Sequence, residues 1–457
     1  MQAPISYDKL VSKWAPVLNE ETAGPISDHY RKQVTAAVLE NQEKAMREEQ
    51  MASSFGSINE AGSDTSDLGK FDPVLISLVR RAMPNMVAYD VCGVQPMSGP
   101  TGLIFAMKSR YKTARGGTSV DDEAMGTAEP VTGFSGDSSF SQSASTPPSG
   151  IIDSDFDNDA DSAHDAERIT ANNNTAGGMT TTEGERLGDT GQAAFAEMGF
   201  TIDKQTVTAK TRALKAEYTM ELAQDLKAIH GLDAETELAN ILSAEVLAEI
   251  NREVIRTINS QAKSGGALTS TGVASADFDL NLDADGRWSV EKFKGLVFQI
   301  EKDANQIAKD TRRGKGNFII CSSDVASALA AAGMLDYAPA MSANLNVDDT
   351  GNTFAGVLNG KMKVYVDPYA ANDYCTVGYK GANAYDAGVF YCPYVPLTMV
   401  RAVGENTFQP KIGFKTRYGM VANPFVTANP IDSTNLVNSV KQNQYYRIFR
   451  VANILGS

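Results

Sequence analysis

Two segments with strand-like sequences flank a long acidic insertion, and this arrangement most constrains how the chain can fold. Residues 101–113 predict one strand, and residues 198–221, rich in Thr and alternating with Lys and Arg, predict one or two more. Between them, residues 118–197 hold 16 acidic and only 2 basic residues among many Ser, Gly, Asp and Asn, a composition typical of loops. A ribbon of two strands is only marginally stable in water. The sequence therefore predicts an extended loop that must lie on something else, and another copy of the chain is the expected support.

The charge of the chain is concentrated in this insertion, and the charge distribution excludes some classes of function. The 457-residue chain has a net charge of −15, which argues against a protein held to nucleic acid by phosphate contacts. The insertion carries a net charge of −14 and residues 1–60 carry −3, so the remaining sequence is nearly neutral. The sequence contains no run of about 18 apolar residues, which is the length needed to span a membrane. Residues 1–21 lack the apolar stretch of a secretion signal. We expect a protein with more than one core and no membrane association.

Helix signals are strongest in two places. Residues 26–51 contain neither Gly nor Pro and predict a helix that has too few apolar positions to hold a core without a partner helix. Residues 233–259 predict a rod about 40 Å long that begins at Asp233. Its apolar residues recur every four positions: Leu238, Leu242, Val246, Ile250 and Val254.

The remaining patterns separate helices from strands. Residues 222–230 predict a short helix, residues 290–311 a second amphipathic helix and residues 324–333 a third, while residues 317–323 predict a buried strand. From residue 354 onward the pattern is that of strands. Since helices and strands are segregated rather than alternating, the fold class is α+β.

The patterns of enzymes and metal sites are weak in this sequence. His29, His164 and His230 lie in unrelated segments, so a catalytic or metal-binding cluster of histidines is not favoured. The motif GVLNGKM, residues 356–362, has three rather than four residues between its glycines and Met where a phosphate-binding loop needs Ser or Thr. We therefore expect no catalytic residue, no cofactor and no bound metal.

One acidic loop keeps an alternative open. Residues 153–164 place Asp at the odd positions of a calcium-binding loop. Asn158 stands where such a loop needs Gly, and His164 stands where it needs Glu. A solvated acidic loop is the preferred interpretation, and calcium binding is the alternative.

The four cysteines do not indicate a disulfide framework. They are far apart in the sequence and form no C-x-x-C pair: Cys92, Cys321, Cys375 and Cys392. We expect buried, reduced thiols.

Several long segments resemble one viral family. The stretch VRRAMPNMVAYDVCGVQPMSGPTGLIFAMKSRY, residues 79–111, resembles the major capsid protein of T-even-type tailed phages, the myovirus major head protein family. The likeness continues in MGFTIDKQ, YTMELAQDLKAIHGLDAETELANIL and EINREV, and then in GKGNFII, FAGVLNGK, VGYKGANAYDAGVFYCPYV and FQPKIGFKTRYGMVANPF. It covers most of the chain in the same order. Residues 113–195 depart from the family, which carries a variable insertion there.

The resemblance implies the Hong Kong 97 phage type of capsid fold. This α+β fold has an N-terminal arm, an extended β-ribbon loop, a peripheral domain with a long spine helix, and an axial domain. The implied domains are 1–60, a helical propeptide removed on maturation; 61–100, the N-terminal arm and the start of the peripheral domain; 101–221, the extended loop with the acidic insertion at 118–195; 222–285, the peripheral domain with spine helix 233–259; 286–350, the axial domain; and 351–457, strands of both domains and the C-terminus.

The resemblance also implies that a prohead protease removes the leader. That protease favours an apolar or small residue, then any residue, then Glu. Three triplets match, LNE at 18–20, INE at 58–60 and LAE at 247–249, and the last lies within the predicted rod. We predict cleavage between Glu60 and Ala61, because the surrounding Gly and Ser keep this joint extended. Ile58 would fill an apolar pocket of the protease, Glu60 would pair with a basic one, and small Ala61 would leave room for the attacking group.

The function implied by the resemblance is structural rather than enzymatic. The chain would self-assemble into hexameric capsomers of an icosahedral phage head that encloses double-stranded DNA without sequence-specific binding. The implied partners are a vertex capsid protein, scaffold and portal proteins, the prohead protease and outer decoration proteins. The implied location is the virion, assembled in the host cytoplasm. Two alternatives stay open: a paralogous pentameric vertex capsid protein and, more remotely, a cytosolic enzyme with a metal in the Asp-rich loop.

Overall fold

The computed structural model describes two compact parts of the chain. The described residues are 7–19, 26, 28–54, 86–114, 119–121, 124, 134–135, 179, 181–189, 195–266, 276–284, 286, 288–333, 335–336, 353–383, 385–404, 409–424 and 441–454. The first unit comprises Met1–Ile104, Gln205–Ala308 and Arg313–Ser457, and the second comprises Phe105–Lys204 and Lys309–Arg312. Each unit is described by itself.

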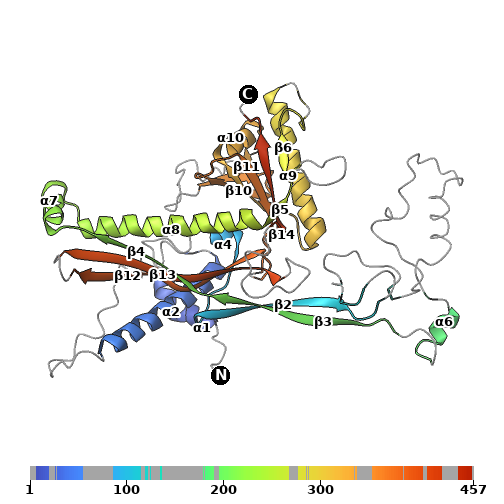
Figure 1. Cartoon of the computed structure of the whole chain (residues 1–457), viewed down its shortest axis with the longest axis horizontal. Coiled ribbons are helices and arrows are strands. Elements are labelled where there is room, and N and C mark those ends of the chain that lie inside the picture. Colours follow the sequence, from blue (N-terminus) through green and yellow to red (C-terminus); the bar gives the residue numbers. More distant parts are fainter. Residues whose placement is uncertain are drawn as a thin grey trace. The chain divides into compact units, whose positions relative to one another are not determined.

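The structure combines helices with sheets in which most strand pairs are antiparallel, which is consistent with the expected α+β class, while α9, β7, α10 and β8 alternate along the chain (Figure 1). The helices are α1 (Tyr7–Leu18), α2 (His29–Ser54), α4 (Ala88–Val91), α6 (Thr181–Glu185), α7 (Met220–His230), α8 (Ala234–Gln261), α9 (Ser289–Thr311) and α10 (Ser323–Ala331). The strands are β1 (Gly93–Val94), β2 (Thr101–Tyr111), β3 (Met198–Thr208), β4 (Lys210–Glu217), β5 (Ala262–Ser264), β6 (Asp277–Asp279), β7 (Phe318–Ser322), β8 (Leu335–Asp336), β9 (Thr353–Leu358), β10 (Met362–Asp367), β11 (Tyr374–Gly378), β12 (Val389–Val403), β13 (Pro410–Ala422) and β14 (Asn443–Ala452). None of the described helices is long and apolar enough to cross a lipid bilayer.

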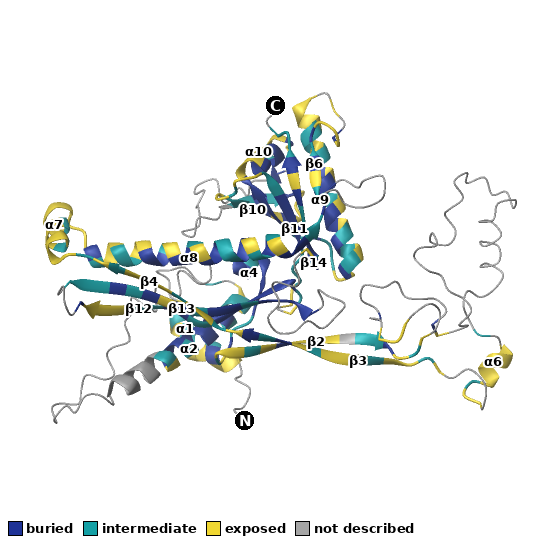
Figure 2. Cartoon of the chain, viewed as in Figure 1, coloured by how far each residue is buried: buried dark blue, intermediate teal, exposed yellow. Residues whose placement is uncertain are grey.

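Helix α8 is the predicted rod, and its sequence explains both its start and its buried face. The Asp233 carboxylate caps it by accepting hydrogen bonds from the Glu235 backbone N–H at 3.3 Å and from the Thr236 hydroxyl at 3.0 Å. Gly231, with a φ of 66°, ends α7 in the left-handed conformation that favours glycine. Figure 2 shows buried and exposed residues alternating along α8. Most of its buried apolar residues, among them Val254 and Ile258, belong to the largest apolar core of the described residues.

A four-stranded sheet in the order β1-β12-β13-β4 packs against α8. Strands β12 and β13 form a long antiparallel pair, and β4 adds to the free edge of β13. Arg212 of β4 links this sheet to the rod, because its guanidinium donates hydrogen bonds to Glu253 of α8 at 2.6 Å and to the Tyr418 hydroxyl of β13 at 2.5 Å. The rod and the sheet therefore share one apolar core, and ion pairs from Arg212 of β4 and Arg401 of β12 to α8 join them at its edge.

The second sheet has the order β5-β14-β11-β7-β10-β9-β8, with β6 paired to β14, and it forms another core with α9 and α10. Strand β7 is buried along its whole length, as predicted for residues 317–323. Gly378 lies directly opposite Phe318, and a Cβ there would lie 2.2 Å from the Phe318 ring, so only glycine fits. All four cysteines are buried and free, which confirms the prediction of reduced thiols.

The structure differs from the expected ribbon in residues 209–221. Strands β2 and β3 pair as expected, but β4 leaves the ribbon after Ala209 and joins β13 of the larger sheet. The Ala209 backbone N–H donates to the Pro100 carbonyl at 2.9 Å, and this is the last bond of the ribbon. The strand signal is continuous through this point, so composition alone does not show that the chain changes its partner strand.

The second unit contains the outer part of the ribbon and a small apolar cluster beside it. This cluster consists of Tyr111, Ala124 and Phe134, and the ring centroids of Tyr111 and Phe134 are 4.2 Å apart. Most of the acidic insertion, including the Asp-rich residues 153–164, lies outside the described residues.

Candidate functional site

The predicted processing residues lie outside the described part of the chain. Ile58, Glu60 and Ala61 fall in the gap between Ser54, where α2 ends, and Met86. The other two matching triplets begin within described helices: Leu18 is the last residue of α1, and Leu247 is buried in the interior of α8. The predicted cleavage between Glu60 and Ala61 therefore stays a prediction, and residues 7–19, 26 and 28–54 of the predicted leader are described.

The segment that the predicted cleavage would remove, which we call the leader, contains two described helices, α1 and α2. The sequence predicted that α2 needs a partner helix, but α1 was not expected. Leu10 and Leu18 of α1 pack with Ala36 and Ala37 of α2 in a separate apolar cluster. Lys13 of α1 joins the pair by ion pairs of 2.7 and 2.6 Å to Glu40 and Glu43 of α2.

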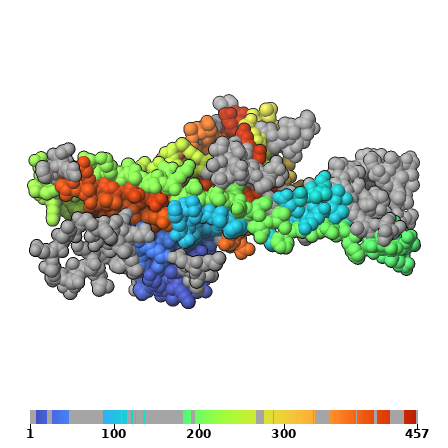
Figure 3. All heavy atoms as spheres, turned by 60° about the horizontal axis from the view of Figure 1, so that its bottom comes forward, coloured from blue at the N-terminus to red at the C-terminus, as the bar shows by residue number. Residues whose placement is uncertain are grey.

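The opposite face of α2 packs against the body of the first unit. Val34, Val38 and Leu39 are 2%, 1% and 1% exposed. They belong to the same apolar core as Tyr89 of α4 and Leu397 of β12. Figure 3 shows the blue leader helices seated against the rest of this unit rather than standing free. The leader is thus part of the largest core of the chain.

Polar contacts fix the position of α2 on the body. The Arg31 guanidinium lies 2.5 Å from the Asp90 carboxylate of α4 and stacks over the Tyr89 ring at 5.9 Å. The Tyr30 hydroxyl donates to the Val94 carbonyl. The Asn41 amide donates to the Met97 carbonyl at 2.7 Å and to the Tyr394 carbonyl at 3.1 Å. Side chains of the leader therefore satisfy three backbone acceptors and one carboxylate of the body.

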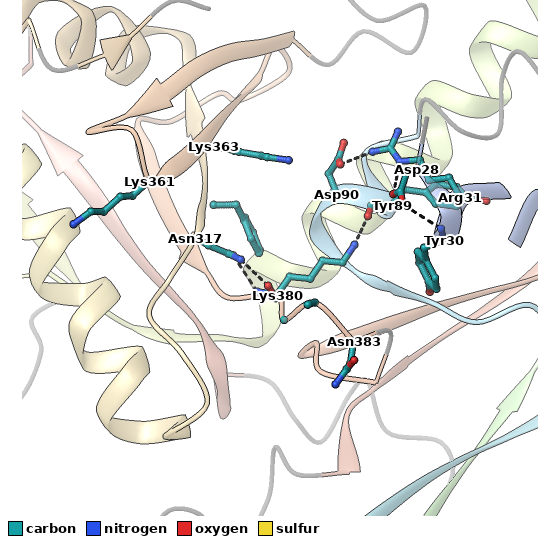
Figure 4. Close-up of a pocket in the computed structure, with 13 residues that line it drawn as sticks. Asp28, Tyr30, Arg31, Tyr89, Asp90, Asn317, Lys361, Lys363, Lys380 and Asn383 are labelled. Carbon is teal, nitrogen blue, oxygen red and sulfur yellow. Dashed lines mark hydrogen bonds and ion pairs between the residues drawn. The ribbon is translucent and has the colours of Figure 1, made fainter. Parts of the chain in front are cut away.

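A cavity of about 380 Å³ lies at one end of this contact (Figure 4). Its lining includes Arg31 from the leader and Asp90, Lys363 and Lys380 from the body. Lys380 donates to the Tyr89 carbonyl, and burial lowers the pKa of its ammonium group. Figure 4 shows Lys363 reaching across the cavity toward the Arg31–Asp90 pair.

The lining of the cavity is rich in charged side chains. Its lining contains no histidine and no cysteine, and the acids Asp28 and Asp90 both face Arg31. Among the described residues, no three His, Cys, Asp or Glu side chains come together in a way that could hold a metal ion. The chemistry of this region is that of a binding contact between two segments of one chain.

A second surface with a functional character lies on the ribbon. The Lys112 N–H donates to the Glu197 carbonyl and the Ala209 N–H to the Pro100 carbonyl, which pairs β2 and β3 antiparallel and places residue 107 opposite residue 202. Phe105 and Met107 of β2 therefore share one face with Met198, Phe200 and Ile202 of β3. Their exposed fractions are 56%, 67%, 48%, 68% and 62%. We call these five residues the apolar ribbon face.

This face was not predicted from the sequence. The signal is present in β3, where Met198, Phe200 and Ile202 alternate with Gly199, Thr201 and Asp203. In the sequence of β2 the signal is obscured, because the apolar residues Ile104 and Ala106 alternate with Phe105 and Met107. Nor does any local pattern mark Arg31, Asp90 or Asn41, whose partners are distant in the sequence.

Comparison with known proteins identifies the family. The model of the family described as "Major capsid protein Gp23" matches residues 68–451. The chain is 44% identical to the major capsid protein of Salmonella phage ViI, over 93% of this chain and 92% of that protein. It is 42% identical to the major capsid protein of Serratia phage KSP90, with the same coverage. Among solved structures, the capsid of Myoviridae phage XM1 covers 80% of this chain and 92% of that one at 9% identity, with a TM-score of 0.38.

The vertex paralogue is a more distant relative. The capsid vertex protein of Enterobacteria phage T4 is 28% identical over only 55% of this chain and 58% of its own length. The full-length matches at higher identity are all to major capsid proteins, so the vertex alternative is not favoured. The chain belongs to the Gp23 family of major capsid proteins.

Proposed function

We propose that this member of the major capsid protein family assembles with itself into hexameric capsomers of an icosahedral phage head that encloses double-stranded DNA. The observation that carries the proposal is the apolar ribbon face. Five large apolar side chains lie together on a two-stranded ribbon, each about half exposed or more. A contiguous apolar surface of this kind marks an interaction site. A second copy of the chain is the partner that a shell supplies to every ribbon.

The remaining elements fit the Hong Kong 97 type of capsid fold in the same proposal. Helix α8 with the β1-β12-β13-β4 sheet would form the peripheral domain, with α8 as its spine helix. Helices α9 and α10 with the sheet of β7 would form the axial domain at the capsomer centre. The ribbon β2–β3 would be the extended loop. The acidic insertion would face outward, where its negative charge keeps particles apart.

Maturation would remove the leader. We assign residues 1–60 to a propeptide cut by a prohead protease between Glu60 and Ala61, with Ile58 in an apolar pocket of that protease. The other proposed partners are a vertex capsid protein, scaffold and portal proteins, and outer decoration proteins. The chain would be assembled in the host cytoplasm and carried in the virion as a structural component with no catalytic role.

The assembly proposal is tested by one substitution on the apolar ribbon face. Phe200→Asp places a charge where a neighbouring copy would bury an aromatic ring, so we expect folded subunits that form few or no closed shells. Electron microscopy of the expressed protein measures this. Thr201→Asp is the matched control, because Thr201 is exposed on the opposite face of the same strand. Normal shells from Phe200→Asp, or equal loss of shells from both variants, would contradict the proposed role of this face.

A further inference from the structure

We propose that the leader helices α1 and α2 are a separable ligand of the body, which keeps them bound after the chain is cut in the joint of residues 55–64. The proposal rests on the proposed function, because it takes removal of the leader as its setting. It adds a step to that function: cutting the chain and releasing the leader are different events. The binding surface is the set Asp90, Val94, Met97 and Tyr394, which we call the leader-binding face.

The apolar contacts carry most of the expected affinity. Val34, Val38 and Leu39 are each no more than 2% exposed, although α2 itself is largely polar. Their partners in the core include Tyr89 of α4 and Leu397 of β12. These side chains are as deeply buried as the residues of α8 in the same core. A contact of this kind does not need a covalent tether to persist.

The polar contacts make the binding specific. Arg31 and Asp90 are only 24% and 27% exposed, and a charged pair that has lost much of its water weakens binding strongly when one partner is removed. The Tyr30 hydroxyl and the Asn41 amide reach three carbonyls on the leader-binding face. If the leader dissociates, Asp90 loses its ion pair with Arg31. The three carbonyls lose these hydrogen-bond donors and must be hydrated instead.

The covalent connection between the leader and the body contributes to their binding only by raising the effective concentration of the leader near the body. A flexible linker typically raises the local concentration of a segment to about the millimolar range. If that were the main reason for the contact, the leader would depart as soon as the joint was cut. The depth of burial and the number of directed contacts favour the opposite result.

The experiment uses the full-length, unassembled chain with a recognition sequence for a site-specific protease placed in the joint and an affinity tag on the leader. After the cut, the tagged leader is immobilised, and the loss of the body is followed over time. We expect the two fragments to stay together through dilution. Arg31→Ala and Asp90→Asn should each speed dissociation about tenfold or more, because each removes the ion pair between these two side chains. The double variant should be no faster than either single variant, because both remove the same contact.

Lys9→Ala is the matched control, because Lys9 is an exposed cation of α1 whose loss changes the charge as Arg31→Ala does. It should leave the dissociation rate unchanged. Melting curves of the uncut variants verify that each one folds. Immediate separation of the fragments in the unaltered chain would overturn the proposal, and so would equal rates for Arg31→Ala and Lys9→Ala. Shell formation is scored separately by electron microscopy. Shells that form although the leader separates at once would refute this inference alone, whereas a retained leader without shells would refute the proposed function.

Discussion

At the scale of single residues, burial governs the chemistry of the four cysteines. Burial raises the pKa of Cys92, Cys321 and Cys392 to about 12 and raises that of Cys375 well above its usual value. The thiolate is the reactive form of cysteine, so these side chains are inert in the folded chain although Cys321 and Cys375 lie directly opposite each other on β7 and β11.

The raised pKa values of the thiols predict how fast the cysteines are modified and how the stability of the folded chain depends on pH. At about pH 8, a thiol-specific alkylating reagent should modify the folded chain far more slowly than the urea-unfolded chain.

The folded-state pKa values are higher than the ordinary value of 9.0, so the neutral thiols stabilise the folded chain at lower pH. That contribution is lost as the pH rises from about 9 toward about 12. Mass spectrometry counts the modified thiols, and urea unfolding at several pH values measures the second effect. Rapid modification of any one cysteine in the folded chain would contradict this account.

At the scale of elements, α8 is stabilised by one buried face. Ile258 is 0% exposed and lies in the largest core, whereas Ile241 of the same helix is 63% exposed. We expect Ile258→Ala to lower the free energy of unfolding by about 2–5 kcal/mol, because it removes buried methylenes and leaves a cavity. Ile241→Ala removes the same atoms from an exposed position and should change the free energy of unfolding by about 0.5 kcal/mol or less. Urea unfolding of both variants compares them, and equal losses would show that burial of this face does not determine the stability of α8.

How far the sequence determines an element depends on where its stabilising contacts lie. The start of α8 is predictable because Asp233 and Gly231 act within a few residues of themselves, and its buried face follows from a spacing of four. The end of the ribbon is not predictable, because residues on both sides of Ala209 are strand formers. The chain leaves β2 after Ala209 because β4 pairs with β13, which is distant in the sequence. The leader contact is not predictable either, since Arg31 and Asn41 meet partners that are brought near only by the folded body.

At the scale of the whole molecule, the segment predicted as one ribbon, residues 101–221, divides into β4, which the single chain supports, and the β2–β3 ribbon, whose outer part it does not. Strand β4 pairs with β13 along its whole length and contacts α8 through Arg212. The outer part of the ribbon carries the apolar ribbon face and has only β2 and β3 to pair with each other. A ribbon of two strands is marginal without further packing. Assembly should therefore change the outer ribbon and leave β4 as it is.

Hydrogen exchange measures this difference within one strand-forming segment. In the unassembled chain we expect fast amide exchange in residues 198–204 and slow exchange in residues 210–217, because local opening is easiest where few buried contacts must be broken. In assembled shells, residues 198–204 should become protected by the copy that covers them, while residues 210–217 should change little. The inner segment thus serves as the control for the outer one, in the same molecule and the same sample. Strong protection of residues 198–204 before assembly would mean that the ribbon is stable by itself, and the apolar ribbon face would then need a role other than contact between copies.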